Sequence, residues 1–191
     1  MPTPEPVLNL LCHPATPAPV VRAIEARACR QSDGTLRIAF CLWGDMARIL
    51  VPPPQPPERT DFLWEHTCFE AFFGVPGEGT YREFNFSPSG QWAAYAFSDY
   101  RQRVEEFTLG NTPHIATQCF AGRLELQAIL APETLPSAAS RFEVGLSAVI
   151  EAADVVDGSH SYWALSHPLE RPDFHHRAAF ILALAQPTHL D

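Results

Sequence analysis

Apolar and polar residues alternate along most of this chain with the two-residue period of half-buried β-strands. Residues 36–43 are the clearest case, because large apolar side chains occupy every second position there. Apolar positions with helical spacing over ten or more residues are hard to find. The pattern predicts eleven strands, at residues 7–12, 20–30, 36–43, 67–73, 81–86, 91–97, 115–120, 123–130, 142–150, 160–165 and 178–185, and one short helix at residues 99–107.

Nineteen prolines and ten glycines separate these segments, as expected for many turns between short strands. We therefore expect an all-β fold, a two-sheet antiparallel β-sandwich of the immunoglobulin-like or jelly-roll-like type with at most one or two short helices. The proline run at residues 52–57 resembles an interdomain linker. The segment before it is too small for a stable domain, so we interpret the run as a long loop within one domain of residues 1–191.

Composition and charge exclude several classes of protein. Hydrophobic residues make up 46% of the chain and charged residues 18%, which is typical of a globular protein. The net charge of −9 would repel nucleic acid, and no basic run offsets it. Apolar runs such as residues 178–185 are shorter than the roughly 20 residues of a membrane span. Residues 1–6 are acidic and proline-rich, unlike a secretory signal, so we expect a cytoplasmic protein.

The cysteines do not form a recognisable disulfide or zinc pattern. Their number is odd, no pair has CxxC spacing, and most lie within predicted strands. We expect them to be small buried hydrophobic residues, and we expect no metal site and no cofactor. The five are Cys12, Cys29, Cys41, Cys68 and Cys119.

The first central hairpin turns at residues 75–78 (VPGE), where proline and glycine favour a type II turn. Centring the hairpin there places Glu70 opposite Glu83, Phe72 opposite Tyr81 and Cys68 opposite Asn85. Two carboxylates would then face each other with Cβ atoms roughly 5 Å apart, and they would repel unless something binds them. A bulge at Gly79 would instead displace the whole register by one residue.

The second central hairpin turns at residues 87–90 (SPSG), which fit a type I turn. Without a bulge at Gly90, Trp92 would lie beside Asn85. With the bulge, Tyr95 would lie beside Glu83. Both alternatives bring an aromatic side chain close to the acidic strand.

Glu70, Glu83 and Asn85 are expected on one sheet face in an aromatic environment. Charged groups in such surroundings are costly unless they are paired or solvated in a cleft. The face is either an ordinary solvent-facing side of an antiparallel sheet or a groove for a ligand. The aromatic residues expected around it are Phe69, Phe72, Phe73, Phe84, Phe86 and Trp92.

The segments LWEHTCFEAFF (63–73) and YREFNFSPSGQWAAYAF (81–97) resemble the superfamily of DOMON-like and family 9 carbohydrate-binding modules. The resemblance extends weakly over most of the chain. It implies a β-sandwich that holds a sugar between two tryptophans, with a glutamate six residues after the first, as in Trp64 and Glu70. Trp163 matches the second tryptophan, and His160 stands where those modules carry an asparagine.

Residues 166–177 gather three histidines, two acids and two arginines in a proline-bounded loop. His167 and His175 could share a metal ion with Asp173, but no established zinc spacing is present, so we expect a hydrogen-bonded loop. Some relatives in the superfamily bind haem through methionine and histidine. Here that would require Met46 and one of His66, His167 or His175.

From these observations we expect a non-catalytic domain that binds a small molecule, most simply a carbohydrate, through an aromatic clamp and an acidic sheet face. The alternatives are a glycoside hydrolase-like enzyme that uses the Glu70 and Glu83 pair, a haem-binding domain, or a structural domain that binds a protein partner. Nothing in the sequence predicts an oligomeric state. The expected ligand-binding residues are Trp64, Glu70, Glu83, Asn85, Trp92, His160, Trp163, His167 and His175.

Overall fold

A computed structural model describes residues 5–136, 141–153 and 159–185 of the chain. Its strands are β1 (Leu8–Cys12), β2 (Val21–Arg30), β3 (Leu36–Gly44), β4 (Cys68–Gly74), β5 (Tyr81–Phe86), β6 (Trp92–Asp99), β7 (Gln102–Arg103), β8 (His114–Phe120), β9 (Arg123–Leu130), β10 (Arg141–Glu151), β11 (His160–Ala164) and β12 (Leu182–Ala185). Helix in these ranges is limited to four three-residue 3₁₀ helices, η1 (Met46–Arg48), η2 (Leu63–Glu65), η3 (Pro132–Thr134) and η4 (Arg177–Ala179). The expected all-β class is confirmed.

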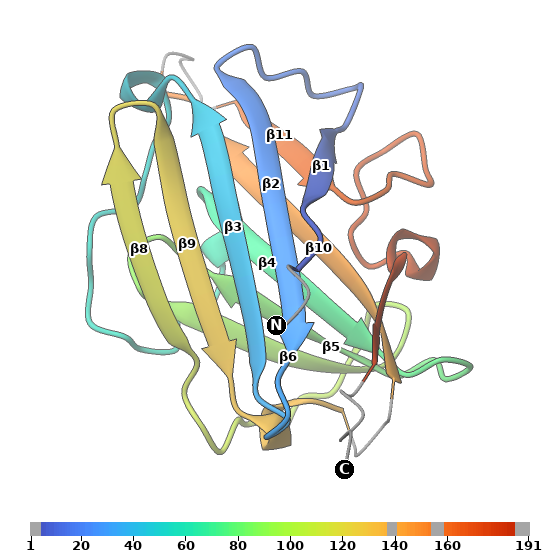
Figure 1. The fold of residues 1–191 in the computed structure, drawn as a ribbon. Helices are drawn as coiled ribbons and strands as arrows, with labels where there is room; N and C mark the ends of the chain where they lie inside the picture. Colours follow the sequence, from blue (N-terminus) through green and yellow to red (C-terminus); the bar gives the residue numbers. More distant parts are fainter. Residues whose placement is uncertain (1–4, 137–140, 154–158, 186–191) are drawn as a thin grey trace.

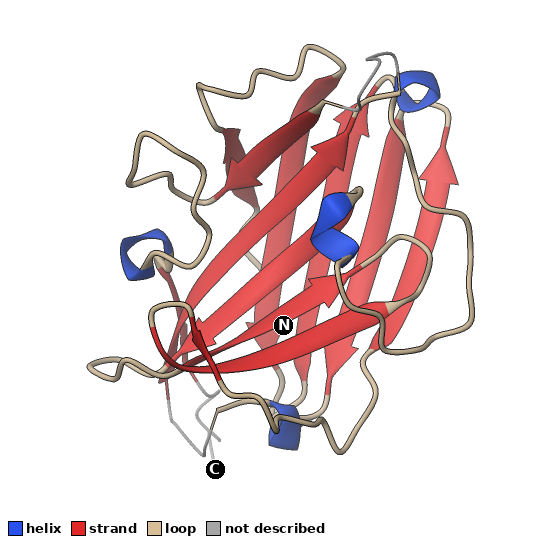
Figure 2. Ribbon diagram, turned by 180° about the vertical axis from the view of Figure 1, so that it is seen from behind, coloured by secondary structure: helices blue, strands red, loops and turns tan. Residues whose placement is uncertain are grey.

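The strands form one hydrogen-bonded path that folds into two packed layers (Figure 1). We call β2, β3, β9 and β8 the front sheet and β7, β6, β5, β4, β10 and β11 the back sheet, in the order of their pairing. β1 joins the sheets, because it pairs with β2 on one side and with β11 on the other, and β12 pairs with β10. All these pairings are antiparallel, as expected for the sandwich, and Figure 2 shows the molecule from behind.

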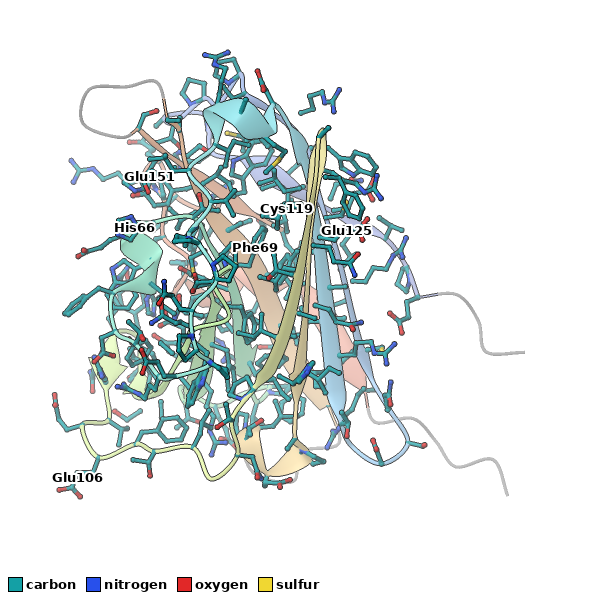
Figure 3. All side chains as sticks on the ribbon, turned by 90° about the vertical axis from the view of Figure 1, so that its left-hand side faces the viewer. His66, Phe69, Glu106, Cys119, Glu125 and Glu151 are labelled. Carbon is teal, nitrogen blue, oxygen red and sulfur yellow. The ribbon has the colours of Figure 1, made fainter. Side chains whose placement is uncertain are left out.

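The main core lies between the two sheets. Leu36, Ile38 and Phe40 of β3 are buried there, and the ring of Phe40 lies 4.9 Å from that of Phe69 in β4. Figure 3 shows Phe69 in the interior of the molecule. Burying each such side chain stabilises the fold by about 1.5–3 kcal/mol. The alternation in the sequence therefore marks the inner face of each strand.

Most of the aromatic residues expected around the acidic face point the other way. They belong to the core between the sheets, and only Phe72 shares the outer face of the back sheet with Glu70. The cause is the two-residue period, which sends odd and even positions of β4 to opposite faces. The misplaced residues are Phe69, Phe73, Phe84, Phe86 and Trp92.

The turn at residues 75–78 forms as expected, but both expected registers of the hairpin are wrong. Gly77 has φ of 81°, and the Glu78 amide donates to the Val75 carbonyl at 3.1 Å. Gly79 and Thr80 extend the loop beyond the turn, so that Tyr81 pairs with Gly74. The register is displaced by two residues from the centred hairpin. An even displacement changes the partners and leaves every side chain on its expected face.

The second hairpin contains the expected bulge at Gly90, whose φ is 94°. The Gly90 amide donates to the Ser87 carbonyl at 3.0 Å, and the Ser87 amide donates to the Gln91 carbonyl at 3.0 Å. Tyr95 consequently pairs with Glu83, so the alternative with the bulge is confirmed.

The eleven expected strands are all present, and β7 is an additional strand. β5 and β9 have the expected bounds, and the ends of the other nine are shifted. The helix expected at residues 99–107 is wrong, because β7 pairs with β6 there. The loop containing the proline run is fixed to the back sheet, since the Gln55 amide donates to the Ser89 carbonyl at 2.8 Å. All five cysteines are free thiols, but only Cys68 is buried as expected. Cys119 is exposed on β8 (Figure 3), and Cys12, Cys29 and Cys41 are partly exposed. The described residues contain no helix long and apolar enough to cross a membrane.

Candidate functional site

A pocket of about 390 Å³ opens on the outer face of the back sheet, and we call it the outer pocket. This volume falls within the range of small-molecule sites. Its lining combines strand residues with residues of the loops that cover the face. The lining residues are Trp64, Glu70, Glu83, Tyr95, Phe97, Arg101, Arg103, Val149, Tyr162, Pro172, Phe174 and His175.

Two buried carboxyl groups lie in the outer pocket. Glu70 of β4 is 3% exposed and Glu83 of β5 is 5% exposed. Asn85 donates from Nδ2 to Oε1 of Glu83 at 2.7 Å, whereas Glu70 accepts only a long hydrogen bond of 3.4 Å from the Ser147 hydroxyl. These contacts leave acceptor capacity on both carboxyl groups for a molecule that enters the pocket.

Burial raises the pKa of both carboxyl groups. Loss of hydration is the main cause for each, and the neighbouring Glu83 charge raises the pKa of Glu70 further. The hydrogen bond from Asn85 and the charge of Arg101 lower the pKa of Glu83 and oppose this effect. The pair therefore holds a proton to a higher pH than free carboxyl groups do, and a protonated member can donate as well as accept a hydrogen bond.

His175 lies beside this pair as a neutral imidazole. Burial lowers its pKa to about 4, and the Arg101 charge acts in the same direction. The Tyr81 hydroxyl accepts from the Arg101 amide at 3.1 Å and forms a hydrogen bond with Nδ1 of His175 at 2.8 Å. We assign the ring proton to Nε2, so that Nδ1 accepts from the Tyr81 hydroxyl; Nε2 lies 3.7 Å from Oε2 of Glu83. His175 thus presents an N–H toward the acidic part of the pocket.

Aromatic side chains form one wall of the pocket. Trp64 of η2 is half-buried, and its ring meets that of Tyr95 edge to face at 5.8 Å. Tyr95 is fixed in turn, because its hydroxyl donates to Asp61 at 2.6 Å. Phe174 and Trp64 both pack against a second buried apolar cluster, separate from the core between the sheets. Its members are Leu63, Cys68, Phe72, Tyr81, Ala93, Tyr95, Phe97, Ala179 and Phe180. Such rings can stack on the apolar CH surface of a ligand.

Two segments far apart in the sequence meet at the pocket rim. Arg101, before β7, donates to Oδ1 of Asp173 at 2.9 Å, and the Tyr100 hydroxyl donates to Oδ2 at 2.5 Å. Asp173 also accepts from the His175 amide at 3.0 Å. This carboxylate therefore ties the histidine-bearing loop to the end of the β6–β7 hairpin.

The expected aromatic clamp is not formed by Trp64 and Trp163. Trp163 of β11 is buried in the core between the sheets, where its indole N–H donates to the Ser161 hydroxyl at 3.0 Å. Trp92 also belongs to that core. Both tryptophans occupy inward positions of their strands, opposite to the face that carries Glu70. Neither of these two tryptophans lines the outer pocket.

Two of the expected histidines lie outside the outer pocket. His160 hydrogen-bonds through Nε2 to the Glu65 carbonyl at 2.8 Å, and His167 does so to the Leu11 carbonyl at 2.8 Å. Each of these contacts holds a connecting segment in place. The structure thus brings together Trp64, Glu70, Glu83 and His175 in the outer pocket. Asn85 does not line the pocket, but it donates a hydrogen bond to Glu83.

The residue pairings expected for the hydrolase and haem alternatives do not occur among the described residues. Glu70 lies opposite Asn85 and is only a diagonal neighbour of Glu83, so the directly opposed carboxylate pair of the hydrolase hypothesis is absent from the ladder. Met46 packs against the core between the sheets and does not line the pocket that contains His175. His66 is exposed and pairs with Glu151 at 2.9 Å (Figure 3). Across residues 5–136, 141–153 and 159–185, no group of three or more metal-ligating side chains occurs.

Several lining residues were not expected from the sequence. Arg101 and Arg103 lie in the segment interpreted as a helix, and Phe174 lies in a loop without periodicity. Tyr162 had a usable signal, because it precedes Trp163 and must face the opposite side of the same strand. Tyr95 was placed correctly beside Glu83 in one of the two hairpin alternatives.

No protein-family model and no curated protein matches the sequence. Solved structures do match. One is a protein from Bacteroides uniformis ATCC 8492 that is provisionally described as carbohydrate-binding, with a TM-score of 0.64 and 15% identity over 95% of this chain and 86% of its own. Another is a family 9 carbohydrate-binding module from Caldicellulosiruptor kristjanssonii in complex with glucose, with a TM-score of 0.49 and 9% identity over 93% and 83%. The chain therefore shares the fold of the Bacteroides uniformis protein.

Proposed function

We propose that this chain binds a carbohydrate in the outer pocket and does not transform it. The observation that carries the proposal is the combination of Trp64 on an aromatic wall with two buried carboxyl groups, Glu70 and Glu83, in the same pocket. Sugar rings present apolar CH faces that stack on aromatic rings and hydroxyl groups that donate to carboxylates. A fold shared with a protein described as carbohydrate-binding supports the same function.

The division of roles follows from the contacts. Trp64 supplies the stacking surface. Glu70 has the most unused acceptor capacity, since the single hydrogen bond that it accepts from the described residues is a long one. Asn85 orients Glu83 by donating to one of its oxygens. His175 contributes its Nε2 proton. A bound sugar hydroxyl would therefore meet acceptors and a donor within one small volume.

Isothermal titration calorimetry with a panel of mono- and disaccharides tests this proposal. We expect saturable heat with at least one sugar, loss of that heat in Trp64→Ala and Glu70→Gln, and retention of it in Trp43→Ala. Trp43 is the matched control, because it is a partly exposed tryptophan on β3, outside the outer pocket. Absence of saturable heat with every sugar, or equal loss in the Trp43 variant, would contradict the proposal.

A further inference from the structure

Arg103 is a cation in the outer pocket with unused hydrogen-bonding capacity. Its guanidinium lies over the ring of Tyr95, with Cζ 4.2 Å from the centroid, and forms no hydrogen bond or ion pair with any described residue. The other arginine of the pocket, Arg101, is bound to Asp173. Arg59, which also lies over Tyr95 at 5.6 Å, is bound to Asp61. Of these three, only Arg103 offers all its donors to an incoming molecule.

The polar groups of the pocket are separated by charge. Glu70 and Glu83 are buried on the sheet, whereas Arg103 is exposed at the rim on β7. The Arg103 charge lowers the pKa of the Glu83 carboxyl group, but no hydrogen bond or ion pair joins Arg103 to Glu83 or to another described residue. A ligand that contacts both the buried carboxyl groups and Arg103 needs hydroxyl donors directed to the carboxyl groups and an anionic group directed to the rim.

We propose that the outer pocket selects sugars that carry a carboxylate, with hexuronic acids as the simplest class, and that Arg103 binds this carboxylate. The inference rests on the proposed carbohydrate binding and specifies its ligand. The sugar carboxylate must lie at the rim, because the neighbourhood of Glu70 and Glu83 would repel it. The hydroxyl groups at the other end of the sugar then reach the buried carboxyl groups.

The position of Arg103 favours this role. Stacking on Tyr95 restricts the guanidinium before any ligand binds, and a planar guanidinium can donate two parallel hydrogen bonds to one carboxylate. Tyr95 is itself held by Asp61, and Asp61 already accepts from Tyr95 and Arg59, so it does not occupy Arg103. Less side-chain entropy is lost on binding when the binding group is fixed in advance.

The test compares sugars that differ only at C6. Calorimetric titrations of the full chain with glucose and glucuronate, and with galactose and galacturonate, measure the preference for the acid. We expect at least one acid to bind about tenfold more tightly than its neutral partner, as one charge-assisted contact would give. The preference should fall in about 1 M salt, where charges are screened beyond about 3 Å.

Two variants locate the preference. Arg103→Met removes the charge and keeps an unbranched apolar side chain near Tyr95, and it should make each acid bind no more tightly than its neutral partner. Arg123→Met is the matched control and should keep the preference, since Arg123 of β9 also stacks on an aromatic ring, with Cζ 4.0 Å from the Phe120 centroid, but does not line the pocket. Thermal unfolding of both variants checks that they fold.

Each outcome decides the inference. Neutral sugars that bind as tightly as the acids would overturn it and leave the proposed carbohydrate binding intact. A preference that survives in Arg103→Met, or disappears equally in Arg123→Met, would also overturn it. If none of the four sugars binds and the wider saccharide panel gives no heat, the proposed function fails and the inference fails with it.

Discussion

Glu70 of β4 lies directly opposite Asn85 of β5, yet the Asn85 side-chain amide donates to Glu83 instead. Among the described residues, only the long hydrogen bond from Ser147 and the charge of Arg101 stabilise the ionised form of Glu70. Both carboxyl groups are buried, but they are not equivalent. Glu70 is the one whose ionisation is less compensated, and its pKa is raised well above the usual value.

This difference predicts how Glu70 affects stability. Between pH 4.5 and the raised pKa of Glu70, the folded protein binds more protons than the unfolded chain, so the free energy of unfolding falls as pH rises. Glu70→Gln replaces the ionisable carboxyl group with a neutral amide, so it removes this decrease in the free energy of unfolding. We expect its Tm to exceed that of the wild type at pH 8, with a smaller difference at pH 4.5, in differential scanning calorimetry.

The control is Glu106→Gln, since Glu106 is exposed on a loop (Figure 3). Its Tm should follow that of the wild type at both pH values. A Glu70→Gln variant that is less stable than the wild type at pH 8 would show that the ionised carboxylate stabilises the fold.

The lowered pKa of His175 predicts a pH dependence of the free energy of unfolding that is opposite in sign to that of Glu70. Its pKa is lowered to about 4, so between pH 6.5 and about 4 the unfolded chain binds more protons than the folded protein. The free energy of unfolding should therefore fall as pH decreases through this range. His175→Gln should reduce this acid-side slope in urea unfolding at pH 7 and pH 5. His114→Gln, at an exposed position of β8, is the control, and an unchanged slope in His175→Gln would refute the assignment.

The sequence predicted the strands and the shared face of Glu70, Glu83 and Asn85, but not the walls of the pocket, and five of the six aromatic residues expected on that face lie on the opposite one. Alternation is a local property, and the two-residue error caused by Gly79 and Thr80 left Glu70, Glu83 and Asn85 on the correct face. The same alternation would have placed Trp163 in the core, and the family resemblance outweighed it. The contact between Arg101 and Asp173 joins loops without periodicity that are 72 residues apart, so no local pattern predicts it.

Asp173 should control the order of the loop that closes the pocket. It accepts from Arg101, from Tyr100 and from the His175 amide. Asp173→Asn removes the charge and weakens these contacts, so amide hydrogen exchange at residues 173–176 should increase roughly tenfold. Asp33→Asn, in the β2–β3 turn, should leave that loop unaffected. Unchanged exchange in Asp173→Asn would mean that packing alone holds the loop.

Gly145 of β10 should be required for the close packing of the Phe180 ring against this strand. A Cβ atom at this position would lie 2.8 Å from the ring of Phe180. We therefore expect Gly145→Ala to destabilise the protein by about 1–3 kcal/mol in urea unfolding. Gly110→Ala is the matched control, because no atom lies within 4 Å of its Cβ position. Equal stability of the two variants would contradict the close packing of Phe180.

Trp64 and Trp163 should separate ligand binding from stability. Trp163 is 6% exposed and fills the core between the sheets, so Trp163→Ala should lower the free energy of unfolding by about 3–5 kcal/mol. Trp64 lies half-buried in the outer pocket, so Trp64→Ala should cost much less stability but abolish sugar binding. Trp163→Phe retains an aromatic side chain in the core and should bind as the wild type does. Loss of binding in a folded Trp163→Phe variant, with binding preserved in Trp64→Ala, would reverse the assignment of the two tryptophans.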